Sequence, residues 1–150
     1  EGLVMAAPRA LSDPAYAPVA AAEVVAREEG LGIWSNPLHR VLCAAQAKDG
    51  LDQYRVVMGK LLGVGETRGT LYLNFGPDWR TDFTVRLRLR SKARRAEARK
   101  QAEAWVGGWL EVRGWLHFFS GPMIDVTSLR GLRTLTPEGS VERDLKRCQG

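Results

Sequence analysis

Few residues in this sequence have the type and spacing needed for catalysis or metal binding. His39 lies in a stretch without periodicity and His117 lies in an apolar run, so both are expected to be structural or solvated. Asp78 and Asp82 flank a turn, but two carboxylates without a third acid seldom hold Ca²⁺ or Mg²⁺. We expect them to cap the turn. The sequence therefore predicts no catalytic residue, no metal site and no cofactor in this chain.

The cysteines and the glycine-rich run do not indicate a familiar type of site. Cys43 and Cys148 show neither a CxxC spacing nor a neighbouring His cluster, which leaves one disulfide or two free thiols as alternatives. Gly63-Val64-Gly65 lacks the GxxxxGKS or GxxxxGKT pattern and does not open a βαβ unit. No phosphate loop for a nucleotide is expected.

The positive charge of the chain is concentrated in one short segment. The net charge is +5, and residues 86–100 hold eight Lys and Arg residues against one Glu. The rest of the chain holds fourteen basic and sixteen acidic residues, so the whole excess lies in this segment. A localised basic patch is what binding to phosphate groups requires.

The basic segment begins on a predicted strand. Phe83, Val85, Leu87 and Leu89 alternate with polar residues, which places the intervening arginines on the opposite face, and Ser91 is a plausible cap for a helix that follows. Three such arginines span about 13 Å, comparable to phosphates along a single strand. Other interpretations are a solvated face or a surface for an acidic protein. The predicted phosphate-binding residues are Arg86, Arg88, Arg90, Lys92, Arg94 and Arg95.

Aromatic residues near this segment could stack on bases. Tyr72 belongs to the strand before the basic one, and Trp79 lies in the turn between them beside Arg80, where it is expected to be exposed. Tyr72 and Trp79 complete the predicted nucleic-acid site. We expect Trp105, Trp109 and Trp115 to point into the core.

The order of elements predicts the fold. Apolar alternation and turn residues indicate strands at 54–64, 70–75 and 83–89, then a helix ending before Gly107-Gly108, then strands at 109–118 and 123–126 with a possible last strand at 132–135. Five short strands with one helix between the third and fourth is the order of the OB-fold. The predicted class is α+β, mainly β with helices. An earlier helix at 14–29 is bounded by Asp13-Pro14 and Gly30.

Two parts of the chain resemble known proteins. AAAEVVAREEGLGIWSNP (20–37) resembles the last helix and following Trp of the staphylococcal-nuclease-like (thermonuclease) family, a likeness that covers residues 1–37. The sequences YLNFGPDWRTDFTV, RGWL and GPMIDVT within 53–135 resemble an OB-like module appended to some bacterial homologues. The resemblance implies a calcium-dependent phosphodiesterase whose catalytic and calcium-binding residues would precede Glu1, so none is carried onto this chain.

The expected organisation follows from both lines of reasoning. Residues 1–37 are interpreted as the end of a nuclease-like domain, 38–51 as a linker, 52–135 as an OB-like barrel and 136–150 as a polar tail, loosely ordered or a short helix. No apolar run approaches the length of a membrane span, and no membrane partner is expected. Localisation stays open between secreted, periplasmic and cytoplasmic.

The expected function is that of an accessory module without catalytic activity of its own. It would bind single-stranded or duplex nucleic acid through phosphate contacts, without strong sequence preference, beside an upstream nuclease-like domain. The alternative is a structural or protein-interaction module that packs on that domain through the helix at 14–29 and Trp34. Activity of this chain alone is disfavoured, because the residues that the family uses for catalysis would lie upstream.

Overall fold

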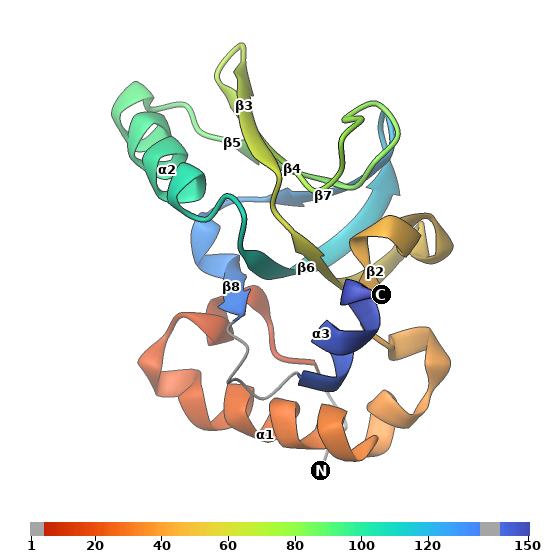
Figure 1. Ribbon diagram of the computed structural model, residues 1–150. Helices are drawn as coiled ribbons and strands as arrows, with labels where there is room; N and C mark the ends of the chain where they lie inside the picture. The colour runs from red at the N-terminus through yellow and green to blue at the C-terminus, as the bar shows by residue number, and fades with distance from the viewer. Residues whose placement is uncertain (1–4, 136–141) are drawn as a thin grey trace.

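The computed structural model describes residues 5–135 and 142–150, which form a curled β-sheet with helices around it (Figure 1). The strands are β1 (Leu42–Cys43), β2 (Gln53–Lys60), β3 (Gly63–Thr67), β4 (Thr70–Asn74), β5 (Thr84–Arg88), β6 (Trp109–Phe118), β7 (Pro122–Val126) and β8 (Leu132–Leu135). The helices are α1 (Ala17–Glu29), α2 (Lys92–Ala104) and α3 (Glu142–Gln149). Short 3-10 turns lie at Pro8–Leu11, Pro14–Tyr16, Gly32–Ser35, Pro37–His39, Ala44–Gly50 and Leu129–Gly131.

The strand pairing is that of an OB-like barrel. The sheet runs β2-β6-β7-β5-β4-β3, with β5 and β7 parallel and the other neighbours along this path antiparallel. β2 and β3 are two halves of one predicted strand, separated only by Leu61 and Leu62. Because one half pairs with β6 and the other with β4, the sheet curls back on itself. The predicted α+β class and OB-like barrel, with a helix between the third and fourth strands, are confirmed.

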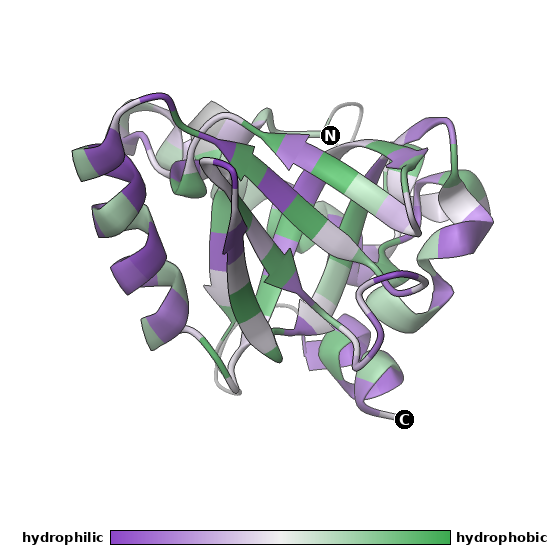
Figure 2. Cartoon of the chain, turned by 90° about the horizontal axis from the view of Figure 1, so that it is seen from above, coloured by the Kyte–Doolittle hydropathy of each residue, from purple (hydrophilic) through white to green (hydrophobic). Residues whose placement is uncertain are grey.

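The barrel interior is filled by the inward-facing residues of the strands, which alternate with outward-facing residues along each strand. Figure 2 shows the alternation as green and purple bands along the strands. Burial of this surface is the main favourable term in folding. α2 closes one end of the barrel, with Ala102 fully buried and Ala98 and Trp105 packed beside it. The fully buried core includes Leu61, Leu71, Leu73, Val85, Leu87, Leu116 and Ile124.

A second apolar cluster lies outside the barrel, between β2 and the ends of the chain. Trp34 is only 9% exposed and packs with Val41, Val56, Met58 and Leu145. The alternative interpretation as a structural module placed the packing partner of Trp34 in an upstream domain. The structure instead supplies that core from the barrel and α3 of the same chain.

The segments predicted as a linker and a polar tail both contribute to this second cluster. Within 38–51, β1 adds a short parallel strand to β2, and within 136–150, α3 docks against the barrel. Cys43 and Cys148 form a disulfide that joins these two segments, which resolves the alternatives that the sequence left open. Residues 136–141 of the predicted tail lie outside the described residues.

A buried cluster of charges joins α1 to the barrel. Glu111, on the outer face of β6, is fully buried and contacts three guanidinium groups: Arg27 of α1 at 2.9 Å, Arg113 of β6 at 2.6 Å and Arg133 of β8 at 3.1 Å. Arg113 also forms two 2.8 Å hydrogen bonds to Glu23 of α1. Burial alone would raise the pKa of Glu111, but the charges of these arginines outweigh it and lower the pKa to about 2.

The low pKa of Glu111 predicts acid sensitivity. Its value is 4.5 in the unfolded reference and about 2 in the folded chain, so between these pH values the unfolded state binds more protons. The resulting stability, about 3 kcal/mol, is present above pH 4.5 and is lost as the pH falls toward 2. Urea unfolding of the wild type and of Glu111→Gln across this range measures it. The wild-type free energy of unfolding should fall more steeply with acid, and parallel curves would contradict the prediction.

The position of Trp34 predicts that its removal destabilises this chain even in isolation. Trp34→Ala should lower the free energy of unfolding by about 3 kcal/mol, because it empties a buried site. Trp115→Ala is the matched control, since Trp115 is 57% exposed, and should change stability by less than about 1 kcal/mol. Thermal unfolding of the two variants compares them. Equal midpoints would show that Trp34 finds its packing partner elsewhere.

Candidate nucleic-acid interface

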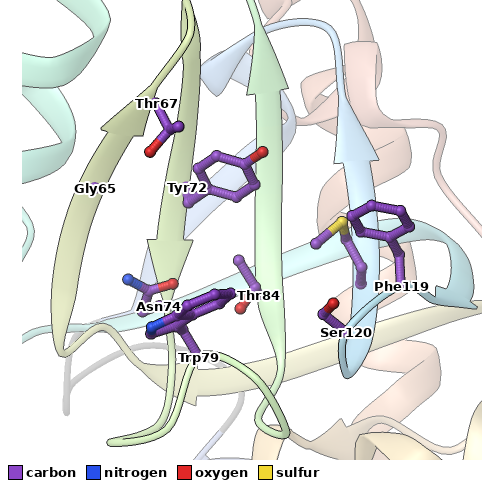
Figure 3. A pocket seen from close by; sticks show the side chains of 9 residues that line it. Gly65, Thr67, Tyr72, Asn74, Trp79, Thr84, Phe119 and Ser120 are labelled. Atoms are coloured by element: carbon purple, nitrogen blue, oxygen red, sulfur yellow. The ribbon is translucent and has the colours of Figure 1, made fainter.

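A groove runs over the outer face of β3, β4 and β5 (Figure 3). Its volume is about 300 Å³, at the lower end of small-ligand pockets. The loop between β4 and β5 forms one wall, and the turn after β6 forms the other. The lining residues are Gly65, Thr67, Tyr72, Asn74, Trp79, Thr84, Phe119, Ser120 and Met123.

Strand alternation explains why these residues face outward together. Leu71 and Leu73 of β4 are fully buried in the barrel, so Tyr72 and Asn74 point to the opposite side. The antiparallel register places Tyr72 opposite Arg86 and Asn74 opposite Thr84. Polar and aromatic side chains from two strands therefore lie in two adjacent rows on one surface.

The loop that carries Trp79 is stabilised by hydrogen bonds between its own aspartate side chains and its backbone. The Asp82 carboxylate accepts a hydrogen bond from the backbone N–H of Asp78 at 2.8 Å, and the Asp78 carboxylate accepts one from the N–H of Arg80 at 3.0 Å. This confirms the interpretation of both aspartates as turn caps. The Arg80 guanidinium lies 4.9 Å from the centre of the Trp79 ring, which is 55% exposed, as the sequence predicted.

Arg86 is not the exposed phosphate contact that the sequence suggested. It is only 8% exposed, and its guanidinium donates two hydrogen bonds to Asp125 of β7, the one from Nη2 at 3.0 Å. These bonds, and the Asp125 charge, raise the pKa of Arg86. His117 Nε2 lies 2.8 Å from the same carboxylate, and the guanidinium lies 5.1 Å from the Phe119 ring centre. Arg86 therefore supports the Phe119 wall of the groove.

The remaining predicted cations divide into two sets. β5 ends at Arg88, so Arg90 lies beyond the strand rather than on a row of three. Arg95 is held by Glu66 at 3.1 Å and by the backbone oxygen of Leu89 at 2.6 Å. Within the part of the chain that the structure describes, the exposed cations without a carboxylate in salt-bridge range include Arg88, Arg90, Lys92 and Arg94. These four follow β5 from the groove face into the start of α2.

Sequence reasoning missed part of the groove and misplaced one aromatic residue. Asn74 was visible as the outward neighbour of Tyr72, but Phe119 follows a strand and carries no periodic signal. Trp115 was expected in the core and is 57% exposed, because the outward positions of β6 that α1 covers are Glu111 and Arg113 instead. The prediction for Trp115 was wrong.

Within residues 5–135 and 142–150, no three His, Cys, Asp or Glu side chains gather closely enough to hold a metal ion. In the same ranges, no helix is both long and apolar enough to cross a membrane.

Comparisons with known proteins give only a distant likeness. No protein-family description and no curated protein matches the chain. One similar structure is a putative aspartyl-tRNA synthetase from Leishmania major Friedlin, at 6% identity and a TM-score of 0.43, covering 65% of this chain and 21% of that one. Another is the S. pombe Stn1-Ten1 complex, at 16% identity and a TM-score of 0.44, covering 64% and 68%. This chain thus spans about a fifth of the synthetase chain, and neither likeness bears on what it binds.

The contacts of Arg86 predict that it stabilises the fold. Arg86→Ala should lower the free energy of unfolding by about 1–2 kcal/mol, because Asp125 loses the two hydrogen bonds that Arg86 donates. Arg88→Ala, two residues along the same strand face, should change it by less than about 0.5 kcal/mol. Urea unfolding at neutral pH distinguishes them, and equal effects would mean that the Arg86–Asp125 pair contributes nothing.

Proposed function

We propose that this chain is an accessory nucleic-acid-binding module that binds a nucleic-acid strand in the groove over β3–β5. The observation that carries the proposal is the combination of three aromatic lining residues with cations at one end of the same face that have no carboxylate partner among the described residues. Tyr72, Trp79 and Phe119 line the groove, and Arg88 extends from it toward α2. Aromatic side chains stack on bases and cations follow the phosphates, the pairing typical of single-strand binding surfaces.

The charge that remains after internal pairing supports phosphate contacts. Arg95 and Arg99 are held by Glu66, and Arg99 also by Glu103 at 2.8 Å. These ion pairs offset the negative charge of Glu66 beside the groove. The free set Arg88, Arg90, Lys92 and Arg94 is therefore available to a polyanion. No catalytic role is assigned to any residue of this chain.

The proposal includes a role beside an upstream nuclease-like domain. The resemblance of residues 20–37 to the end of such a domain motivates it. In that setting the barrel would hold substrate while a separate site, with its calcium, cleaves it. Both the activity and the calcium would belong to that upstream domain.

One observation favours the alternative of a protein-interaction module. α1 buries Glu23, Val24, Ala26 and Arg27 against this chain but leaves Val19 and Val25 45–50% exposed. Exposed apolar side chains beside a packed helix are available for a protein contact. This surface lies on the α1 side of the molecule and leaves the groove open, so both roles can coexist.

Binding across a salt series tests the proposed function. A labelled single-stranded oligonucleotide should lose affinity for the triple variant Arg88→Glu, Arg90→Glu, Lys92→Glu, with a shallower dependence on salt, about 0.7 per lost phosphate contact. Trp79→Ala should weaken binding roughly tenfold without changing the salt slope, because it removes stacking alone. Fluorescence anisotropy measures both, and a duplex of the same sequence is run beside the single strand.

A control variant separates the effect of charge at the groove from the effect of net charge on affinity. Arg143→Glu changes net charge as one site of the triple variant does, but lies on α3, on the α1 side of the barrel. It should leave affinity nearly unchanged. Triple-variant binding equal to the wild type at every salt concentration would rule out the basic end of the groove as the phosphate contact.

A further inference from the structure

The turn at the tip of the β3–β4 hairpin holds an arginine in a backbone conformation that arginine rarely adopts. Thr67 of β3 pairs with Thr70 of β4, so Arg68 and Gly69 are the two central residues of the turn. Their φ angles are +49° and +78°. A two-residue turn with positive φ at both positions is type I′, which prefers asparagine or aspartate followed by glycine. Gly69 fits this preference and Arg68 does not.

Local contacts give no reason for an arginine at this position. Arg68 is exposed, and no carboxylate among the described residues lies within salt-bridge range of it. Glu66, two residues earlier, is paired with cations of α2 instead. The other non-glycine residues with positive φ in the described ranges are of types common in turns, Asp52 and Ser120. An unfavourable conformation without a stabilising contact points to a function for the side chain.

The strand register places this turn at the basic end of the groove. Thr67 lines the groove, and Figure 3 shows it at the opposite end from Trp79. Thr70, the partner of Thr67, pairs on its other side with Arg88 of β5. Adjacent strands lie about 4.8 Å apart, so this row of three residues spans about 10 Å. Arg68 follows Thr67 directly, where the groove meets the cations that follow β5.

The segment that leads into α2 lies beside the same turn. A Cβ atom built on Gly69 would lie 3.5 Å from Nη1 of Arg95. The same nitrogen donates hydrogen bonds to the backbone oxygens of Leu89 at 2.6 Å and Arg90 at 3.3 Å. Arg95 therefore links the hairpin tip to the connection between β5 and α2. Arg68 and Arg90 lie around one end of the groove although they come from different elements.

The hairpin tip is open to a ligand and fixed in position. Figure 1 shows the β3–β4 hairpin projecting from the barrel, away from α1 and α3. A type I′ turn continues the twist of its two strands. The place of Arg68 is therefore set by β3 and β4 rather than by a flexible loop.

We propose that Arg68 is a phosphate contact of the bound strand, and that the hairpin gives up stability to hold this charge at the end of the groove. The inference rests on the proposed function and adds a contact from the β3–β4 hairpin to those of β5 and α2. The chemistry recognised is the phosphodiester backbone. A strand whose bases stack at Trp79 would run past Thr67 and place its phosphates between the hairpin and the start of α2.

Substitution of Arg68 is expected to move stability and affinity in opposite directions. Arg68→Asn removes the charge and supplies a residue that the turn prefers. Its melting temperature, measured without nucleic acid, should rise by about 2 °C. Its affinity for a labelled oligo(dT) of about 12 residues should fall about fivefold at 0.1 M salt, with a salt slope lower by about 0.7. Arg68→Lys keeps the charge and the unfavourable conformation, so it should match the wild type in both measurements.

A control variant shows whether the effect depends on the position of the charge. Arg143→Gln also removes one positive charge, but from an exposed position on α3, away from the groove. It should leave affinity and salt slope nearly unchanged. An equal loss of affinity in Arg143→Gln and Arg68→Asn would assign the effect to net charge and overturn the contact.

The outcomes separate this inference from the function on which it rests. Absence of wild-type binding would overturn both. Wild-type affinity and salt slope in Arg68→Asn would overturn the contact alone, because the groove would still bind the strand. A melting temperature that does not rise in Arg68→Asn would overturn the stability cost assigned to Arg68, whatever the affinities are.

Discussion

The structure depends on one buried carboxylate. Glu111 lies near the start of β6, on its outer face, where a side chain is ordinarily solvated. Removing a charge from water is expensive, and arginines repay that cost only when several bonds converge with good geometry. Arg27, Arg113 and Arg133 provide such bonds from α1, β6 and β8. The N-terminal helix and the last strand of the barrel are thereby fixed on the same side of β6.

This arrangement divides the outer surface of one barrel into two halves. Over β2, β6 and β8, the surface is covered by α1, α3 and the second apolar cluster around Trp34. Over β3, β4 and β5, it stays open and holds the groove, and Figure 1 shows α1 and α3 on the side away from the β3–β4 hairpin. The Arg86–Asp125 pair lies on the open half, where it supports the Phe119 wall without covering the floor. Covering one half with helices leaves the other as the surface for a ligand.

The sequence predicted the barrel because its information is local. Alternation in 70–75, 83–89 and 109–118 and the helix before Gly107 each depend on neighbours a few residues away. The predictions that failed concern contacts between residues far apart in the sequence. Alternation indicated that Arg86 points out of the barrel but not that Asp125, 39 residues later, would hold it. The partner of Arg27 is 84 residues away, and Cys43 and Cys148 are separated by 105. Likewise, alternation cannot tell that Trp115 lies beyond the part of β6 that α1 covers.

The groove is formed before any ligand enters. Hydrogen bonds between Asp78, Asp82 and the backbone shape the loop that carries Trp79, and Asn74 is fixed by β3 and β5. Ordering flexible side chains and loops on binding costs about 0.5–1.5 kcal/mol for each side chain, and a preformed site avoids much of that loss. The cations at the end of β5 differ, since Arg90, Lys92 and Arg94 are exposed and adjustable. A rigid groove beside adjustable cations would suit the proposed nucleic-acid ligand, whose bases are alike in thickness but whose backbone varies in path.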